Sequence, residues 1–147
     1  MTATITVSIW HNVTRDSEGR PTGYFGFNPG DSMVRVFTYQ APADGRPAEA
    51  VAEEAFEAFN ADPELLTGRQ LELAIRYRNR ALRSLSRGDL VVVGEVALAC
   101  ERAGWAPVRG GITEVRAGEH GTHPLPAGRP ARAGQRPAAR GKGDQPR

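Results

Sequence analysis

The N-terminal third of the chain carries patterns that are typical of β-strands. Residues 4–9 alternate strictly between polar and apolar side chains, which predicts a strand with one buried face. Residues 24–27 are predicted to form a short second strand, and residues 33–40 a further one. The Pro- and Gly-containing segment 41–47 then predicts a loop that ends this group of strands.

Two amphipathic helices are predicted to follow. The first spans about 47–60, with Pro47 in its first turn, Asn60 at its end and one apolar face formed by Val51, Ala55, Phe56 and Phe59. The second spans about 68–85, with Thr67 as a candidate N-cap. Its core-facing residues are predicted to be Leu71, Ala74, Ile75, Ala81, Leu82 and Leu85.

A compact β unit is predicted after the helices. Residues 90–93 and 96–100 are apolar runs around Gly94-Glu95, a pair that suits a type II′ hairpin, and residues 105–108 can add a third strand. The fold class is therefore α+β: a small mixed domain with an N-terminal β-hairpin or sheet, two helices and a C-terminal β-meander.

The composition changes after Val108. Residues 109–147 lose apolar periodicity and become rich in Gly, Pro, Ala and Arg, which predicts a disordered tail behind a domain at 1–108. The domain holds 11 Arg and 14 Asp+Glu, a balance of −3, whereas the tail holds 8 Lys+Arg and 3 Asp+Glu, a balance of +5. The basic character of the chain thus belongs to the tail.

The remaining composition is that of an ordinary globular protein. Of 147 residues, 39% are hydrophobic and 24% charged. No apolar run approaches the roughly 18 residues that span a bilayer, and no secretory signal pattern is visible. The one cysteine excludes an internal disulfide. We therefore expect a cytoplasmic protein without membrane contact, and the sequence leaves its oligomeric state open.

The residue types that usually carry catalysis do not form a recognisable pattern. His120 and His123 have HxxH spacing but lie in the predicted tail, and no other ligands converge on them. Cys100 lies in a predicted strand, where a small core residue is more common than a nucleophile. No catalytic triad, phosphate-binding loop or tuned acid/base pair is present. We predict no enzyme activity, no cofactor and no metal.

A basic stripe is the main candidate for a contact surface. Its members are spaced by 7, 4, 3 and 4 residues on the second predicted helix: Arg69, Arg76, Arg80, Arg83 and Arg87. Such a stripe can lie along the phosphates of a nucleic acid. It can equally be solvated, bind a protein, or pair with the acidic first helix, which carries Glu49, Glu53, Glu54 and Glu57. Pairing or solvation is the preferred interpretation.

Aromatic residues are concentrated in the N-terminal part of the chain: Trp10, Tyr24, Phe25, Phe27, Phe37 and Tyr39. We expect most of them to pack in the core. An exposed aromatic sheet face that stacks nucleic-acid bases is the alternative, but few basic residues are interleaved with these rings.

One segment resembles a known family. Residues 77–93 contain Arg83-Ser-Leu-Ser-Arg-Gly-Asp89 before an apolar strand, and residues 104–107 read Gly-Trp-Ala-Pro. Over residues 70–108 the chain resembles the YodL-like domain, whose hallmark is an RSLSxGD turn that enters a β unit ending in a Gly-aromatic pair. This sequence departs from the pattern at Arg87, where a small apolar residue is expected. The resemblance implies an actinobacterial or mobile-element context and brings no catalytic residues.

The RSLSRGD segment also has a structural interpretation. The Ser84 and Ser86 side chains can bond backbone groups where a helix ends. Gly88 can adopt a positive φ, and Asp89 can accept backbone N–H groups before the strand begins. From the sequence we expect a non-enzymatic accessory protein that binds an unknown macromolecular partner. A nonspecific nucleic-acid-binding module is the alternative, and a small enzyme is the least favoured one.

Overall fold

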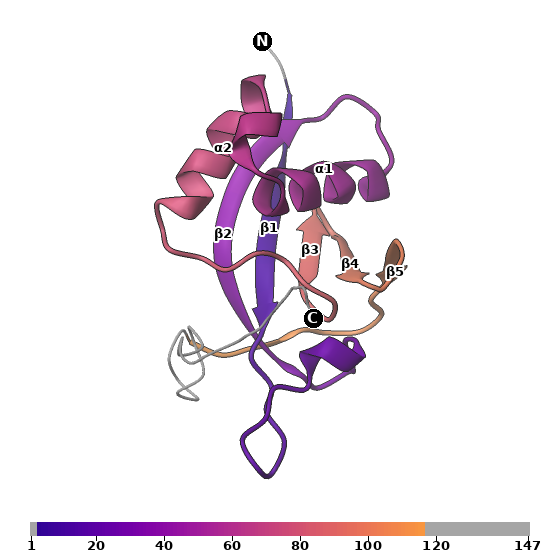
Figure 1. The fold of residues 1–147 in the computed structure, drawn as a ribbon. Coiled ribbons are helices and arrows are strands. Elements are labelled where there is room, and N and C mark those ends of the chain that lie inside the picture. The colour runs from indigo at the N-terminus through magenta and orange to yellow at the C-terminus, as the bar shows by residue number, and fades with distance from the viewer. Residues whose placement is uncertain (1–2, 117–147) are drawn as a thin grey trace. The chain divides into compact units, whose positions relative to one another are not determined.

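The computed structural model describes residues 3–116, which adopt the predicted α+β architecture (Figure 1). Six strands form one curled sheet in the order β5-β4-β3-β1-β2-β6. Neighbouring strands are antiparallel except for β2 and β6, which are parallel. The strands are β1 (Thr4–Asn12), β2 (Ser32–Pro42), β3 (Leu90–Val93), β4 (Val96–Cys100), β5 (Trp105–Pro107) and β6 (Thr113–Glu114).

Two helices cover one face of the sheet: α1 (Ala48–Asn60) and α2 (Gly68–Arg78). Two short 3-10 helices, η1 (Gly23–Phe25) and η2 (Pro63–Leu65), complete the elements. The predicted first helix is confirmed, with Val51, Ala55 and Phe59 buried. Among the described residues, no helix combines the length and the apolar character that a membrane crossing requires.

The two faces of the sheet support separate hydrophobic clusters, because side chains alternate between the faces along each strand. The larger cluster lies between the sheet and the helices and includes Val7, Ile9, Phe37, Phe59 and Tyr77. The smaller cluster on the opposite face consists of Trp10, Met33, Leu90 and Ala99, with Phe27, Val92, Val108 and Ile112 packed against it.

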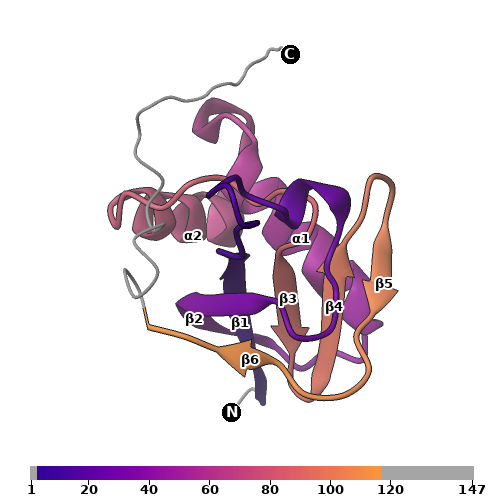
Figure 2. The ribbon, with the colours of Figure 1, turned by 90° about the horizontal axis from the view of Figure 1, so that it is seen from below.

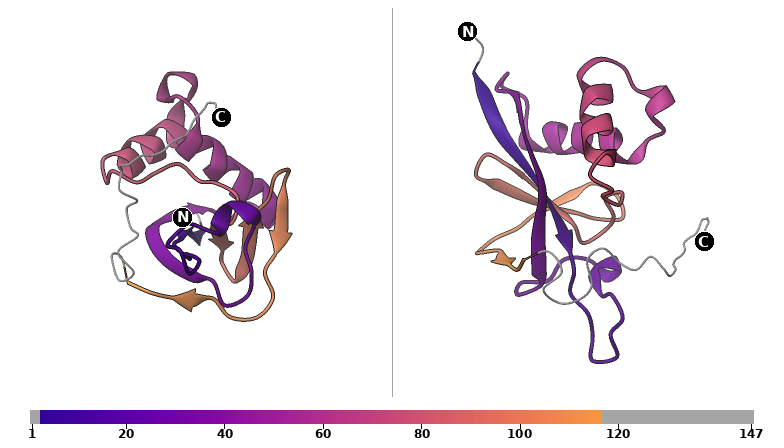
Figure 3. Two further views of the ribbon diagram at one scale, coloured as in Figure 1. Left: turned by 60° about the horizontal axis from the view of Figure 1, so that its bottom comes forward. Right: turned by 90° about the vertical axis from the view of Figure 1, so that its left-hand side faces the viewer.

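The segment Val108–Val115, called the strap below, runs from β5 to the other edge of the sheet. It passes on the face opposite the helices, where Ile112 packs against the smaller cluster (Figures 2 and 3). Its last part forms β6, and the Val115 N–H donates to the Met33 carbonyl at 2.8 Å. The described fold therefore continues past the domain end predicted at Val108. The predicted disorder of residues 117–147 lies outside the described residues.

The predicted strand at residues 24–27 is wrong, because η1 occupies this place. Phe25 donates its N–H to the Thr22 carbonyl at 3.0 Å, and Gly26 donates to Gly23 at 2.8 Å. These i to i+3 hydrogen bonds wind the chain, and the φ of +106° at Gly26 ends the turn. Local aromatic content therefore does not produce a strand here.

The second helix is shorter than predicted and buries a different face. It ends at Arg78, and Ala81 adopts a φ of +57°, which is incompatible with a continuing right-handed helix. Its buried residues are Leu73, Ala74 and Tyr77, whereas Ile75 is 48% exposed. The predicted core face is therefore correct only in part. Leu82 and Leu85 still pack against the core, but from the loop that follows.

The hairpin between β3 and β4 has the predicted turn. Gly94 has a φ of +63°, while Glu95 is not among the residues with positive φ, as a type II′ turn requires.

The loop before β3 is held by Asn60 at the end of α1. Its side chain accepts the Leu85 N–H and donates to the Leu85 carbonyl, both at 2.8 Å.

Candidate partner-binding surface

The five arginines of the predicted stripe do not lie along one helix. Arg69 and Arg76 belong to α2, whereas Arg80, Arg83 and Arg87 lie in the loop between α2 and β3. The helical spacing that suggested one continuous surface therefore does not apply beyond the end of α2. Each arginine has its own surroundings, and these decide whether it is available to a partner.

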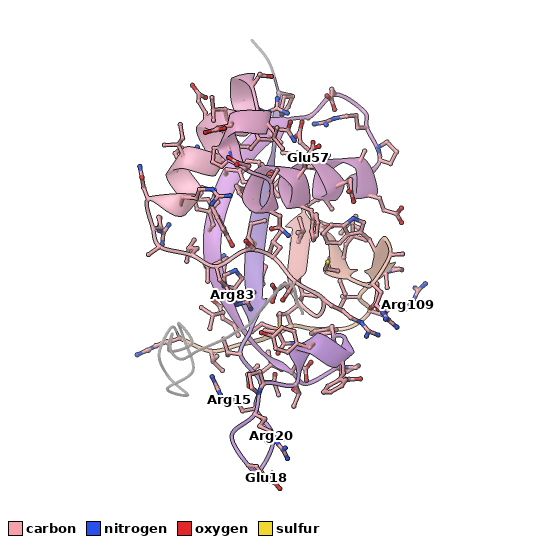
Figure 4. All side chains as sticks on the ribbon, in the orientation of Figure 1. Arg15, Glu18, Arg20, Glu57, Arg83 and Arg109 are labelled. Carbon is pink, nitrogen blue, oxygen red and sulfur yellow. The ribbon has the colours of Figure 1, made fainter. Side chains whose placement is uncertain are left out.

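Arg69 pairs with the acidic helix, as the preferred interpretation expects. Its Nη2 lies 2.8 Å and 2.7 Å from the two carboxylate oxygens of Glu54 on α1. Glu53 accepts the indole N–H of Trp105 on β5 at 3.0 Å. Glu57, which is labelled in Figure 4, accepts a hydrogen bond from the Gln70 side chain at 2.9 Å. The acidic face of α1 therefore helps to hold α2 and β5 in place.

Arg83 is committed to a buried carboxylate. Its Nη1 and Nη2 donate to the two oxygens of Asp89 at 2.7 Å and 2.9 Å, and the Asp89 side chain is 1% exposed against 34% for Arg83. Burial by itself would raise the pKa of Asp89, but the charge and hydrogen bonds of Arg83 outweigh it and lower that pKa. The position of Arg83 beside the sheet is visible in Figure 4.

Asp89 also organises the turn before β3, as predicted. Its carboxylate accepts the backbone N–H of Ser86 at 2.8 Å and that of Asn12 at 2.9 Å. Gly88 has the expected positive φ, +92°. Ser84 is exposed, lies beyond the end of α2, and supplies its carbonyl oxygen to Arg83 at 2.9 Å. Its predicted role at a helix end is therefore wrong.

Two residues at the end of β1 join this network and were not singled out from the sequence. The Asn12 side chain donates to Asp31 at 2.9 Å and to the Gly88 carbonyl at 3.1 Å. His11 is fully buried, and its Nε2 lies 2.8 Å from the Tyr77 hydroxyl. The signal in the sequence was the position of two adjacent polar residues at the end of a strand whose earlier residues alternate between polar and apolar.

The Tyr77 hydroxyl connects His11 to the loop after α2. It donates to the Arg83 carbonyl at 2.8 Å. Because a phenol has one proton to donate, His11 Nε2 must carry a proton and donate to Tyr77. Burial is the main reason that the pKa of Tyr77 is raised, and the Asp89 charge adds to it. Tyr77 therefore stays protonated and serves as a structural link.

The side chain of Arg87 extends from the turn before β3 toward η1. Its Nε is 3.6 Å from a Glu101 carboxylate oxygen, and its Nη1 lies 3.4 Å from the Tyr24 carbonyl. Gly88 lies even closer to η1, since a Cβ there would be 2.1 Å from the Gly23 carbonyl oxygen. The RSLSRGD turn thus forms the support on which the backbone of η1 rests.

The η1 helix presents two aromatic side chains to solvent. Tyr24 is 57% and Phe25 is 78% exposed, whereas Gly23 beside them is buried. We call this pair the aromatic knob. The expectation that the N-terminal aromatic residues pack in the core holds for Trp10 and Phe37 but fails for the knob.

Arg76 and Arg80 cover an aromatic ring at the surface. Their guanidinium carbons lie 5.4 Å and 6.0 Å from the centre of the Phe37 ring, which is itself buried. Both arginines are exposed and, within residues 3–116, neither forms an ion pair with a carboxylate. They are the part of the predicted stripe that a partner can reach.

The candidate metal and nucleophile residues give no site in the part of the chain that the structure describes. No group of three or more His, Cys, Asp or Glu side chains there is arranged to hold a metal ion. His120 and His123 lie outside the described residues. Cys100 is buried, and this burial raises the pKa of its thiol to about 11, so it is a poor nucleophile near neutral pH.

Comparisons with family models, with curated proteins and with solved structures give no match. The resemblance of residues 70–108 to the YodL-like domain therefore remains a hypothesis from the sequence.

Proposed function

We propose that this chain is a non-enzymatic accessory protein that binds another protein through the aromatic knob. The observation that carries the proposal is the exposure of Tyr24 and Phe25, at 57% and 78%, on a backbone segment that is packed against the rest of the fold. Aromatic residues are enriched in the buried centres of protein interfaces and lose little entropy when they are held in advance.

Two adjacent residues of the turn before β3 hold the backbone of the aromatic knob in place. Arg87 contacts the Tyr24 carbonyl, and its guanidinium lies 3.6 Å from the place of a Cβ on Gly26. Gly88, the next residue of the same turn, packs directly against the backbone of Gly23 in η1. These contacts fix the backbone on which the rings stand, so binding does not have to order it.

The charge of the fold favours a protein over a nucleic acid as the partner. Residues 3–116 hold 13 Arg and 15 Asp+Glu, which gives a balance of −2. Three arginines of the predicted stripe, Arg69, Arg83 and Arg87, are in ion pairs with carboxylates of the same chain. Nonspecific nucleic-acid binding needs several free cationic groups along one surface. These ion pairs reduce the number of arginines that are free for such binding.

Site-specific photocrosslinking tests the proposal with a matched control. We would replace Phe25 with benzoylphenylalanine in the full chain and, in a second variant, replace Leu65, which is also 78% exposed but lies on η2. We expect a discrete protein adduct in cells from position 25 that is absent from position 65. With the purified partner, Phe25→Ala should weaken binding at least about tenfold, whereas Leu65→Ala should leave it unchanged.

Two results would contradict the proposal. Equal adducts from both positions would show that the crosslinks report exposure and not recognition. Adducts that disappear after nuclease treatment, together with an affinity that falls steeply with salt, would support the nucleic-acid alternative instead.

A further inference from the structure

The outer edge of β2 is a second surface, independent of the aromatic knob. β1 pairs with β2 from Asn12↔Met33 to Thr4↔Pro42, whereas β6 pairs only with Ser32 and Met33 on the other side. Within residues 3–116, no strand lies beside the rest of that outer edge. The right-hand view of Figure 3 looks onto β2 from this side.

The ladder shows which backbone groups face outward. The Thr6 carbonyl accepts the Gly94 N–H at 2.8 Å, so the backbone of Thr6 is directed toward the β3 side of β1. Two directly opposite residues in an antiparallel pair direct their backbone N–H and C=O groups either toward each other or both away from each other. Gln40 opposite Thr6, and Thr38 opposite Ser8, therefore direct their backbone groups away from β1.

Exposed arginines flank this edge on both faces of the sheet. Arg76 and Arg80 lie over Phe37 on the helix face. Arg35 of β2 lies 5.6 Å from the Trp10 ring centre on the opposite face. Arg35, like the other two, forms no ion pair with a carboxylate among the described residues. The edge therefore combines unpaired backbone groups with positive charge on either side.

We propose that β2 binds an extended acidic segment of a partner protein, which adds to the sheet as a further strand along residues 35–41. The outward N–H and C=O groups of Thr38 and Gln40 supply main-chain hydrogen bonds. Alternate side chains of an added strand lie on opposite faces, so acidic residues on it can reach Arg76 and Arg80 or Arg35. A second copy of this edge would bring like charges together and is disfavoured.

A synthetic peptide tests the proposal without a known partner. The probe is an eight-residue peptide of alternating Glu and Val, compared with the same peptide carrying Lys for Glu and with one that is N-methylated at alternate residues. We expect the acidic peptide to slow hydrogen exchange of the Thr38 and Gln40 amides in the full chain. The Lys and N-methylated peptides should bind at least about tenfold more weakly.

Variants of one position separate strand addition from simple charge attraction. Thr38→Pro removes an outward N–H, which a strand edge tolerates, whereas Thr38→Val keeps that N–H and a similar size. We expect both variants to keep the melting temperature within a few degrees and only Thr38→Pro to lose peptide binding. Arg76→Gln with Arg80→Gln should weaken binding about two- to tenfold, and Arg102→Gln, an exposed arginine elsewhere, should not.

Several outcomes would overturn the inference. Equal binding of the N-methylated peptide, or full binding by Thr38→Pro, would show that backbone pairing is not involved. No binding of the acidic peptide at millimolar concentration would mean that the arginines only protect an open edge from pairing. None of these results bears on the knob, which is tested by its own crosslinks.

Discussion

Replacing Asp89 with Asn should destabilise the fold strongly at neutral pH. The carboxylate accepts two hydrogen bonds from Arg83, at 2.7 Å and 2.9 Å, and one backbone N–H each from Ser86 and Asn12. An Asn side chain has the same shape, but its amide group would place N–H donors against some of these four donors. Arg83 would also lose its counter-charge.

The magnitude follows from the burial of the pair. Removing one partner of a buried ion pair costs about 3–5 kcal/mol. Because the Arg83 side chain is 34% exposed and can regain water, we expect about 3 kcal/mol for Asp89→Asn at pH 7. A domain of this size has about 5–15 kcal/mol of stability, so the variant should still fold.

Urea unfolding of four proteins measures the effect: the original chain, Asp89→Asn, Arg83→Gln and the double variant. The double-mutant cycle should give a coupling of about 1–3 kcal/mol between the two side chains. Because the pKa of Asp89 is lowered on folding, its contribution is complete above the unfolded value of about 4 and is lost as the pH falls through the folded value.

The stability difference between the original chain and Asp89→Asn should therefore shrink in acid. A difference below about 1 kcal/mol at pH 7 would refute the assignment of Asp89 as the organiser of the turn, since it is smaller than the cost of one buried unsatisfied donor. A difference of 3 kcal/mol that does not change down to about pH 3 would refute the electrostatic reason for it.

Three further changes have definite expected results. Gly88 and Gly104 both have a left-handed φ, +92° and +83°, but of the two only Gly88 would place a Cβ against a backbone carbonyl oxygen. Gly88→Ala should therefore lower the free energy of unfolding in urea by about 1–3 kcal/mol more than Gly104→Ala does. Residues 1–116 should melt like the full chain, whereas residues 1–108, which lack most of the strap, should melt at least about 8 °C lower. An equal melting temperature for both would contradict the role of the strap. Cys100 should react with iodoacetamide at pH 7.5 only after unfolding, and fast labelling of the native chain would contradict its burial.

Elements with strong local signals could be predicted from the sequence. The alternation in β1, the amphipathic α1 and the Gly94 turn each depend on neighbouring residues, and all three are confirmed. The end of α2 could not be predicted. The helix periodicity continues to Leu85, but Asn60, which is 25 residues away at the end of α1, binds the backbone of Leu85 in the following loop. Tyr77 of α2 also donates to the Arg83 carbonyl and so helps to hold that loop.

The candidate surface was predictable only in its residue types. The pairing of Arg69 with the acidic helix followed from charge complementarity. The commitment of Arg83 to Asp89 and the support of η1 by Gly88 depend on tertiary contacts between the turn, the end of β1 and η1. The open edge of β2 depends on the order of the strands, which no local pattern contains.

The central place of β1 has a consequence for how the chain folds during its synthesis. β1 is made first and can form a hairpin with β2, but its other neighbour, β3, begins only at Leu90. At 5–20 residues per second, roughly 4–16 s pass between the synthesis of the two strands. During that interval Val7 and Ile9 belong to a sheet that is complete on one side only, and the nascent chain is most vulnerable to aggregation there.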